Sequence, residues 1–166
     1  MAKKTAYLGL FAALAILFGY VESLIPISLF IPGIKLGLCN LVIVFVLYKF
    51  STKEALLVSI IRILVIGFMF GNLMSILFSL GGGILSLFCM YLLKRTGKFS
   101  VCGVSIFGGT MHNVGQMLIA LMVVPGKALL FYLPVLCIVG AFTGLLIGII
   151  SMLILKRFEK ADSWRL

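Results

Sequence analysis

Long apolar runs separated by short polar turns make up almost the whole of this chain. A helix that crosses the hydrocarbon core of a membrane needs roughly 20 mostly apolar residues. Six runs approach this length, and Gly, Pro or charged residues separate them. The pattern therefore predicts six transmembrane helices, at about residues 5–25, 34–49, 53–68, 72–93, 101–124 and 128–155.

The helix boundaries depend on a few turn residues. The first run ends at Pro26, and the Ser51-Thr-Lys-Glu54 sequence is typical of a helix N-cap. The break at residues 67–72 is the least marked, and five spans plus a re-entrant element are the alternative there. Three consecutive glycines at 81–83 are expected to loosen or kink the fourth helix.

Composition places these helices in lipid. The chain has 166 residues, of which 63% are hydrophobic and 11% charged, whereas soluble domains are near half apolar and a quarter charged. So few charges cannot cover the surface of a soluble fold. We therefore expect an all-α integral membrane protein, a six-helix bundle with a single transmembrane domain over residues 1–166. The first apolar run is longer than a signal-peptide core, so we expect it to be retained.

The basic residues predict the orientation of the bundle. The net charge is +10, but it lies in short clusters between apolar runs, which is typical of topology signals and anionic-lipid contacts rather than nucleic-acid binding. With the N-terminus inside, only Lys35 and Lys127 fall in outer turns, and Arg62 falls within a helix. The other basic residues are then cytoplasmic, which predicts an N-in, C-in topology: Lys3, Lys4, Lys49, Lys53, Lys94, Arg95, Lys98, Lys156, Arg157, Lys160 and Arg165.

Residues for catalysis or metal binding are missing from the pattern. The four cysteines lie in apolar runs without a CxxC pair, and no two of the four acidic residues are close enough to share a metal. No phosphate-binding loop, nucleophile elbow or zinc-protease motif occurs. We therefore expect no catalytic residue, no metal and no cofactor, and an energy source that comes from a partner or an ion gradient.

The fifth apolar run contains the richest polar segment. At 100° per residue, Gly109, His112, Asn113 and Gln116 fall on one arc of the helix. Because lipid cannot satisfy these groups, the arc is expected to face the bundle. It forms either one wall of a substrate pocket or polar contacts between helices, made closer by glycine.

Arg62 lies at membrane depth, where an ionisable residue is a functional hypothesis by default. It either anchors an anionic substrate or pairs with Glu22 and helix-end carbonyls. Glu22, near the outer end of the first helix, is either solvated or paired with Lys35.

The outer half of the bundle has further candidates. Asn40 and Asn72 lie near the outer starts of the second and fourth helices, and Lys35 marks the start of the second. Lys35, Lys127 at the start of the sixth helix, Arg62 and the outward-facing helix N-termini together predict an electropositive region suited to a carboxylate or phosphate. In the alternative, the lysine side chains only extend to the interface.

The first helix carries small residues at four-residue spacing, among them the pair Gly9 and Ala13. Such pairs allow another helix to approach closely, within the chain or in a partner.

Two segments carry a resemblance to a known family: Pro32-Gly-Ile-Lys-Leu-Gly-Leu-Cys-Asn40 and Gly108-Gly-Thr-Met-His-Asn-Val-Gly-Gln116. Over roughly residues 5–155 the chain resembles the bacterial Gx transporter family, also named heptaprenyl diphosphate synthase component I. That family is similar to the substrate-binding S components of energy-coupling factor (ECF) transporters. These are six-helix proteins of the bacterial cytoplasmic membrane that dock onto a transmembrane coupling protein driven by two ATPases.

The resemblance implies a ligand site near the outer face and a docking face on the first helix. There Gly9 and Ala13 take the place of the strict Ala-x-x-x-Ala form, which this chain has only at Ala2 and Ala6. The leading hypothesis is a substrate-binding subunit for a small anionic or amphipathic nutrient or cofactor precursor, and not an enzyme. The expected site consists of Lys35, Asn40, Arg62, Asn72, His112, Asn113 and Gln116.

The second family name implies a different function. Prenyl diphosphate synthases hold Mg²⁺ and diphosphate with aspartate-rich motifs, whereas this chain has one aspartate, Asp162 in its tail. The alternative hypothesis is therefore a non-catalytic membrane accessory subunit of an isoprenoid- or quinone-linked enzyme or a redox complex.

Overall fold

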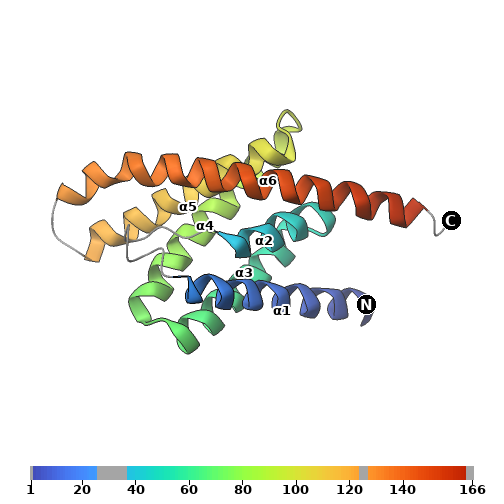
Figure 1. The fold of residues 1–166 in the computed structure, drawn as a ribbon, viewed down its shortest axis with the longest axis horizontal. Helices are drawn as coiled ribbons and strands as arrows, with labels where there is room; N and C mark the ends of the chain where they lie inside the picture. The colour runs from blue at the N-terminus through green and yellow to red at the C-terminus, as the bar shows by residue number, and fades with distance from the viewer. Residues whose placement is uncertain (1, 26–36, 124–126, 164–166) are drawn as a thin grey trace.

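The protein is all-helical over the residues that the computed structural model describes, which are 2–25, 37–123 and 127–163. These residues form six α-helices and one 3₁₀ helix (Figure 1). The elements are α1 (Ala2–Leu24), α2 (Leu38–Lys49), α3 (Thr52–Phe70), α4 (Leu73–Thr96), α5 (Val101–Val123), η2 (Lys127–Tyr132) and α6 (Leu133–Ser163). The predicted all-α class is confirmed.

Two of the expected helix starts are wrong, each for a local reason. The second helix begins at Leu38 rather than near residue 34, because Gly37 has a φ of 72°, which a continuing right-handed helix does not allow. The sixth begins at Leu133 rather than 128, after the 3₁₀ turn η2. Pro134 then lies in the first turn of α6, where its missing N–H has no helical partner to lose.

Four described helices are long and apolar enough to cross a membrane: Lys3–Leu24, Leu73–Thr96, Val101–Val123 and Leu129–Phe158. Helix α2 is apolar but shorter, and α3 carries Lys53, Glu54 and Arg62. This is the pattern of a multi-pass membrane protein. The six-span count and its orientation stay predictions.

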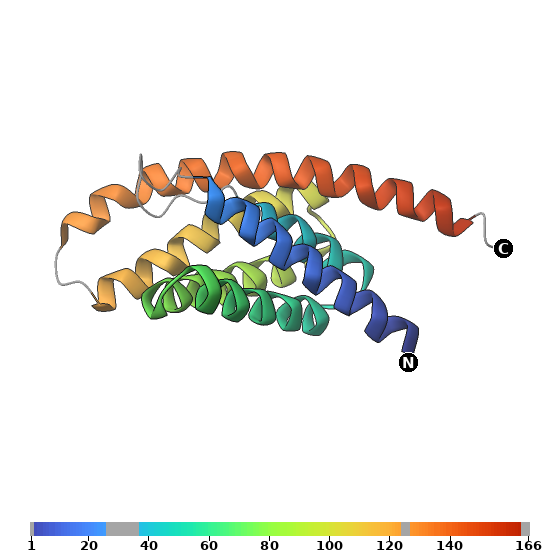
Figure 2. The same ribbon diagram turned by 60° about the horizontal axis from the view of Figure 1, so that its bottom comes forward.

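Helix α2 lies at the centre of the bundle, packed against α1, α3 and α6 (Figures 1 and 2). Each of residues 42–47 is at most 5% exposed. A helix that is apolar on all sides is stable only when other helices surround it. At 1.5 Å per residue α2 is about 18 Å long, much less than the membrane core.

Other helices cap both ends of α2. At its N-terminus Gly37 has no capping side chain, and its N–H donates instead to Oε1 of Glu22 in α1, at 2.6 Å. At the C-terminus, Nζ of Lys94 in α4 donates to the Leu47 carbonyl at 2.5 Å and lies 4.9 Å from the ring centroid of Tyr48. A carboxylate at the N-terminus and an ammonium at the C-terminus both complement the helix dipole.

Helix α4 runs without interruption through its three glycines, so they do not break the helix, and the expected kink stays a prediction. The glycines serve close packing. A Cβ on Gly82 would lie 2.7 Å from the His112 carbonyl oxygen of α5, and one on Gly83 would lie 3.1 Å from Ile63 of α3. Helix α4 therefore approaches α3 and α5 at the same level.

A second glycine contact joins α5 to α6. Gly140, Gly144 and Gly148 of α6 follow at four-residue intervals along one face. A Cβ on Gly144 would lie 2.6 Å from the Ser105 carbonyl, and one on Gly148 would lie 2.7 Å from the Cys102 Cα. Backbones this close leave no room for side chains, as in small-xxx-small packing in membranes.

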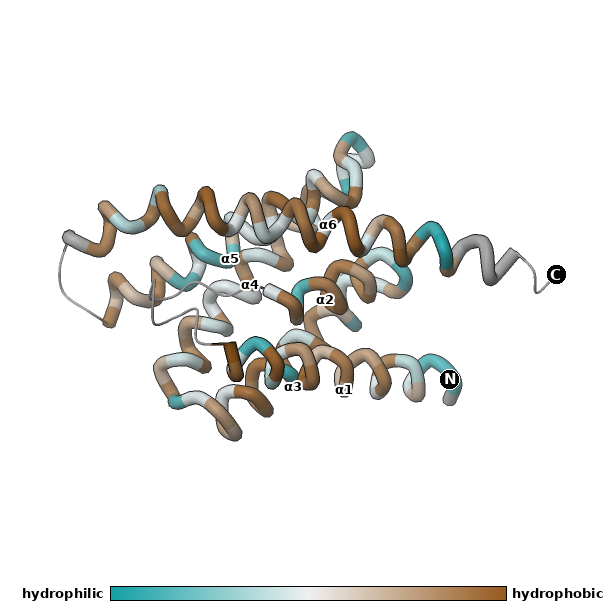
Figure 3. The backbone as a smooth tube through the Cα atoms, in the orientation of Figure 1, coloured by the Kyte–Doolittle hydropathy of each residue, from teal (hydrophilic) through white to brown (hydrophobic). Residues whose placement is uncertain are grey.

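The N-terminal end of α1 and the C-terminal end of α6 lie at one end of the bundle, whereas the α3–α4 connection, the C-terminal end of α5 and the N-terminal end of α6 lie at the other (Figures 1 and 2). Hydrophobic residues dominate most of the helical surface, with hydrophilic residues near the N-terminal end of α1 and late in α6 (Figure 3). This distribution fits a bundle whose middle part is surrounded by lipid.

Candidate functional site

Arg62 is a buried cation on the inner face of α3. Its side chain is 9% exposed, and its Nε has no hydrogen-bond partner within the described part of the chain. Val58 lies one turn before it and Ile66 one turn after it on the same helix face. Ile66 and Cys39 both pack against Gly19 of α1, which places this face of α3 toward α1 and α2.

Glu22 does not serve as the described partner of Arg62. Its Oε1 accepts the Gly37 N–H, and its Oε2 lies 3.8 Å from the thiol of Cys39. The Glu22 carboxylate therefore binds the N-terminus of α2 rather than the guanidinium of Arg62. The predicted alternative of Lys35 as its partner falls on a residue outside the described range.

The polar arc of α5 divides between two neighbouring helices. His112, Asn113 and Gln116 are each 8% exposed, so the arc faces inward. Asn113 turns to α6, where its Nδ2 donates to the Leu136 carbonyl at 2.6 Å. The Nε2 atoms of His112 and Gln116 are 3.1 Å apart, and both side chains lie against Gly82 of α4.

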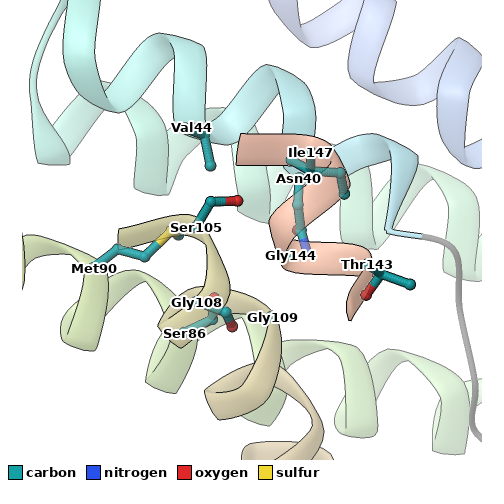
Figure 4. Close-up of a pocket in the computed structure, with 10 residues that line it drawn as sticks. All are labelled: Asn40, Val44, Ser86, Met90, Ser105, Gly108, Gly109, Thr143, Gly144 and Ile147. Carbon is teal, nitrogen blue, oxygen red and sulfur yellow. Dashed lines mark hydrogen bonds between the residues drawn. The ribbon is translucent and has the colours of Figure 1, made fainter. Parts of the chain in front are cut away.

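Asn40 lines a small cavity of mixed polar and apolar lining between α2, α4, α5 and α6 (Figure 4). The cavity measures about 10 Å³, which is room for about one water molecule. Ser86 of α4 donates to the Gly108 carbonyl of α5 at 2.7 Å, and Thr143 donates to the Gly140 carbonyl in the preceding turn of α6 at 3.3 Å. Their remaining lone pairs are free to accept. Its full lining is Asn40, Val44, Ser86, Met90, Ser105, Gly108, Gly109, Thr143, Gly144 and Ile147.

Asn72 has a clear local role. Its Oδ1 accepts the Ser75 N–H at 2.8 Å and its own N–H donates to Ser75 Oγ at 3.1 Å, forming a capping box at the start of α4. It is exposed at the tip of the α3–α4 hairpin, so the described structure does not bring it into contact with the other candidates.

Helix α1 presents Gly9 and Ala13 on its free face. Both are exposed, and a Cβ on Gly9 would meet no atom within 4 Å. Since α1 packs on α2 and α3 with its other side, this small-residue pair is open to a partner.

A comparison with known protein families tests the resemblance that the sequence suggested. The sequence model for heptaprenyl diphosphate synthase component I matches residues 11–154, which is most of the chain. The chain belongs to the heptaprenyl diphosphate synthase component I family. Neither the curated proteins nor the solved structures contain a match to it. The predicted family is confirmed, whereas the similarity to ECF S components stays a prediction.

In this member of the heptaprenyl diphosphate synthase component I family, the candidates form three separate groups. Arg62 faces α1 and α2, His112 and Gln116 face α4, and Asn40 lies in the cavity beside α6. Among the described residues, no group of three or more His, Cys, Asp or Glu lies close enough to hold a metal.

The sequence did not predict the hydroxyl groups that line the small cavity beside Asn40, which belong to Ser86, Ser105 and Thr143. Single serines and threonines are common in membrane helices, so no pattern marks them. The α6 glycines beside them had a readable signal, because Gly140, Gly144 and Gly148 repeat at strict four-residue spacing.

Proposed function

We propose that the chain is a membrane-embedded substrate-binding subunit of the S-component type. It takes up a small anionic or amphipathic molecule at the outer side of the bacterial cytoplasmic membrane, without catalysing a reaction. The observation that carries the proposal is Arg62, a residue only 9% exposed whose guanidinium Nε is buried without a partner in the described structure.

Burying a charge without a partner is costly, and it is rarely retained unless a partner arrives. A guanidinium remains charged at any physiological pH and presents a planar set of donors that fits a carboxylate or phosphate. A bound anion would supply the missing acceptor. The ligand class we propose therefore carries at least one such group.

The other polar groups lie apart from Arg62 in this structure and are proposed to join it when the ligand binds. Asn40, His112 and Gln116 would supply hydrogen-bonding groups, and Lys35 is proposed to attract the anion at the outer end. Asn72 takes no part in this site, because its side chain caps α4. We assign Asn113 a supporting part, because its amide already fixes α5 to α6. The present cavity holds about one water, far less than the roughly 300 Å³ of a ligand pocket. Binding therefore requires α2 to move away from α5 and α6.

The free face of α1 supports a partner for this subunit. We propose that Gly9 and Ala13 receive a helix of a transmembrane coupling protein that works with ATPase subunits. Exposed small residues permit close backbone approach, and this chain has no nucleotide-binding motif of its own.

A second candidate function follows from the family's name, which describes a component of a synthase. The chain would then be the membrane partner of a catalytic synthase subunit. Its one aspartate, Asp162, is too few for diphosphate–Mg²⁺ chemistry, so it would hold or position that subunit rather than react.

The test is native mass spectrometry of the purified protein, with extraction and identification of bound small molecules. The variants are Arg62→Gln and Arg95→Gln, which each remove one guanidinium. Arg95 is exposed at the end of α4, and its Nη1 lies 3.4 Å from the Tyr91 hydroxyl, so its loss should leave an interior site intact.

The substrate-binding proposal expects an anionic metabolite in the wild type and in Arg95→Gln, reduced about tenfold or more in a folded Arg62→Gln protein. A wild-type protein that carries no metabolite but holds a stable protein partner, equally in both variants, would favour the synthase-partner function instead.

A further inference from the structure

The α3–α4 connection differs in charge from every other connection in the chain. No Lys, Arg, Asp or Glu occurs from Ile63 to Leu93. The other connections contain or adjoin a lysine, such as Lys35, Lys98 or Lys127. Turns that reach water at a membrane surface usually carry polar or charged anchors, and this turn has none.

The side chains around the turn are large, apolar and outward-facing. Phe68 is 76% exposed, Met69 65% and Leu73 66%. Phe70 is half-exposed, and its ring lies 4.9 Å from that of Tyr20 on α1. Such a cluster at a helix end is unfavourable in water.

The polar groups of the turn bond mainly to each other. Asn72 and Ser75 exchange hydrogen bonds through Oδ1, Oγ and both backbone N–H groups, and Ser75 Oγ also donates to the Asn72 carbonyl at 2.8 Å. The Gly71 N–H donates to Gly67 and the Ile76 N–H to Asn72, both at 3.1 Å. A turn that satisfies its own donors and acceptors needs less water, which is the condition for placing it at membrane depth.

The length of α3 leads to the same position. Its charged first turn contains Lys53 and Glu54, and Glu54 pairs with Lys4 of α1 at 2.5 Å, which fixes that end at a membrane surface. The rest of α3, residues 55–70, is about 24 Å long at 1.5 Å per residue, and its one charged residue is Arg62, which is buried. The hydrocarbon core is about 30 Å thick, and tilt shortens the reach further. Helix α4 starts at the same turn and is long enough to span the core, so a turn at this depth requires α4 to be strongly tilted.

We propose that the α3–α4 turn ends inside the hydrocarbon of the opposite leaflet, and that lipid acyl chains cover Phe68, Met69 and Leu73. The turn is an intramembrane turn and does not reach the aqueous phase. This inference depends on the chain being a membrane protein and not on the proposed ligand.

The test places a single tryptophan at the turn. The chain has one tryptophan, Trp164, so Trp164→Phe provides a background for Phe68→Trp. The matched control is Phe99→Trp, in the lysine-bearing α4–α5 turn, where the side chain is 42% exposed. Each protein is reconstituted into phosphatidylcholine vesicles with or without bromine at mid-chain positions, and aqueous iodide is added on both sides.

The expected result for Phe68→Trp is a loss of emission of about twofold or more in brominated lipid, and little change with iodide, because the ring lies in hydrocarbon. Phe99→Trp is expected to respond more strongly to iodide. Iodide quenching of Phe68→Trp equal to that of Phe99→Trp would overturn the proposal. If Phe68→Trp does not fold, Met69→Trp tests the same position.

Discussion

Buried polar side chains in this bundle reach their partners in different ways. Asn113 donates to a carbonyl of another helix, Glu22 accepts the backbone N–H of a third, and Arg62 keeps an unpartnered Nε in the described structure. Such groups are satisfied in most folded proteins, because an unpaired buried polar atom loses its hydrogen bonds to water. Tyr48, Tyr132 and Ser151 also have a buried oxygen without a partner in the described structure, but Arg62 is the charged residue among these and so most invites an anionic ligand.

Glu22 is predicted to stabilise the start of α2. Glu22→Ala leaves the Gly37 N–H without its acceptor and removes a negative charge from a helix N-terminus. The expected loss is roughly 1–2 kcal/mol of stability. The measurement is thermal unfolding of the purified protein in detergent.

Glu22→Gln is the matched control, since its amide oxygen can still accept the hydrogen bond. It should lose clearly less stability than Glu22→Ala. Equal midpoints for Glu22→Ala and wild type would show that the Gly37 contact contributes nothing.

The sequence predicted at this scale which residues are inside, but not what they contact. The inward position of His112, Asn113 and Gln116 follows from helical spacing and polarity alone. The partner of Asn113 does not follow, because it is a backbone carbonyl at Leu136, and every residue has one. Substrate binding by these residues remains a prediction.

Among the helices, glycine contacts decide which pairs come closest. Gly144→Ala places a methyl group 2.6 Å from the Ser105 carbonyl, so α5 and α6 must separate. We expect a destabilisation of about 1–3 kcal/mol, the usual cost of overpacking. Unfolding followed by circular dichroism in detergent would measure it.

Gly9→Ala is the matched control on α1, because a Cβ there meets nothing within 4 Å. Alanine is the better helix former, so stability should be unchanged or slightly higher. A Gly144→Ala protein as stable as Gly9→Ala would mean that α5 and α6 are not tightly packed at this point.

The lengths of the apolar runs predicted the helices better than their ends or their contacts. The break at Gly71 and Asn72 follows from the turn residues, whereas the late start of α2 depends on the left-handed backbone of Gly37. A run of glycines predicts flexibility in isolation. In α4 neighbouring helices pack against Gly82 and Gly83, which only tertiary structure can specify.

The whole bundle has the N-terminal end of α1 and the C-terminal end of α6 at one side, as an even number of crossings requires (Figures 1 and 2). We predict that both ends lie in the cytoplasm, because the lysine and arginine clusters follow the positive-inside rule. Fusion of a fluorescent protein that matures only in the cytoplasm should give signal at either terminus. A periplasm-active phosphatase fused at the same positions should be inactive.

Phosphatase activity at the C-terminus with fluorescence at the N-terminus would indicate an odd number of crossings.

The sequence predicts the lipid environment of the whole molecule from composition alone. The central position of α2 was not predictable, because the run is as apolar as those that face lipid and differs from them only in length.

The capping of α2 by its neighbours also determines when this helix can be completed. Glu22 precedes α2 in the chain, whereas Lys94 follows Leu47 by 47 residues. During synthesis the ribosome delivers α1 and α2 well before the last turn of α4 emerges. Until then the Leu47 carbonyl near the C-terminal end of this short helix has no Lys94 ammonium to donate to it. The central helix α2 is therefore synthesised second. Both of its ends are capped only after the fourth helix has been made.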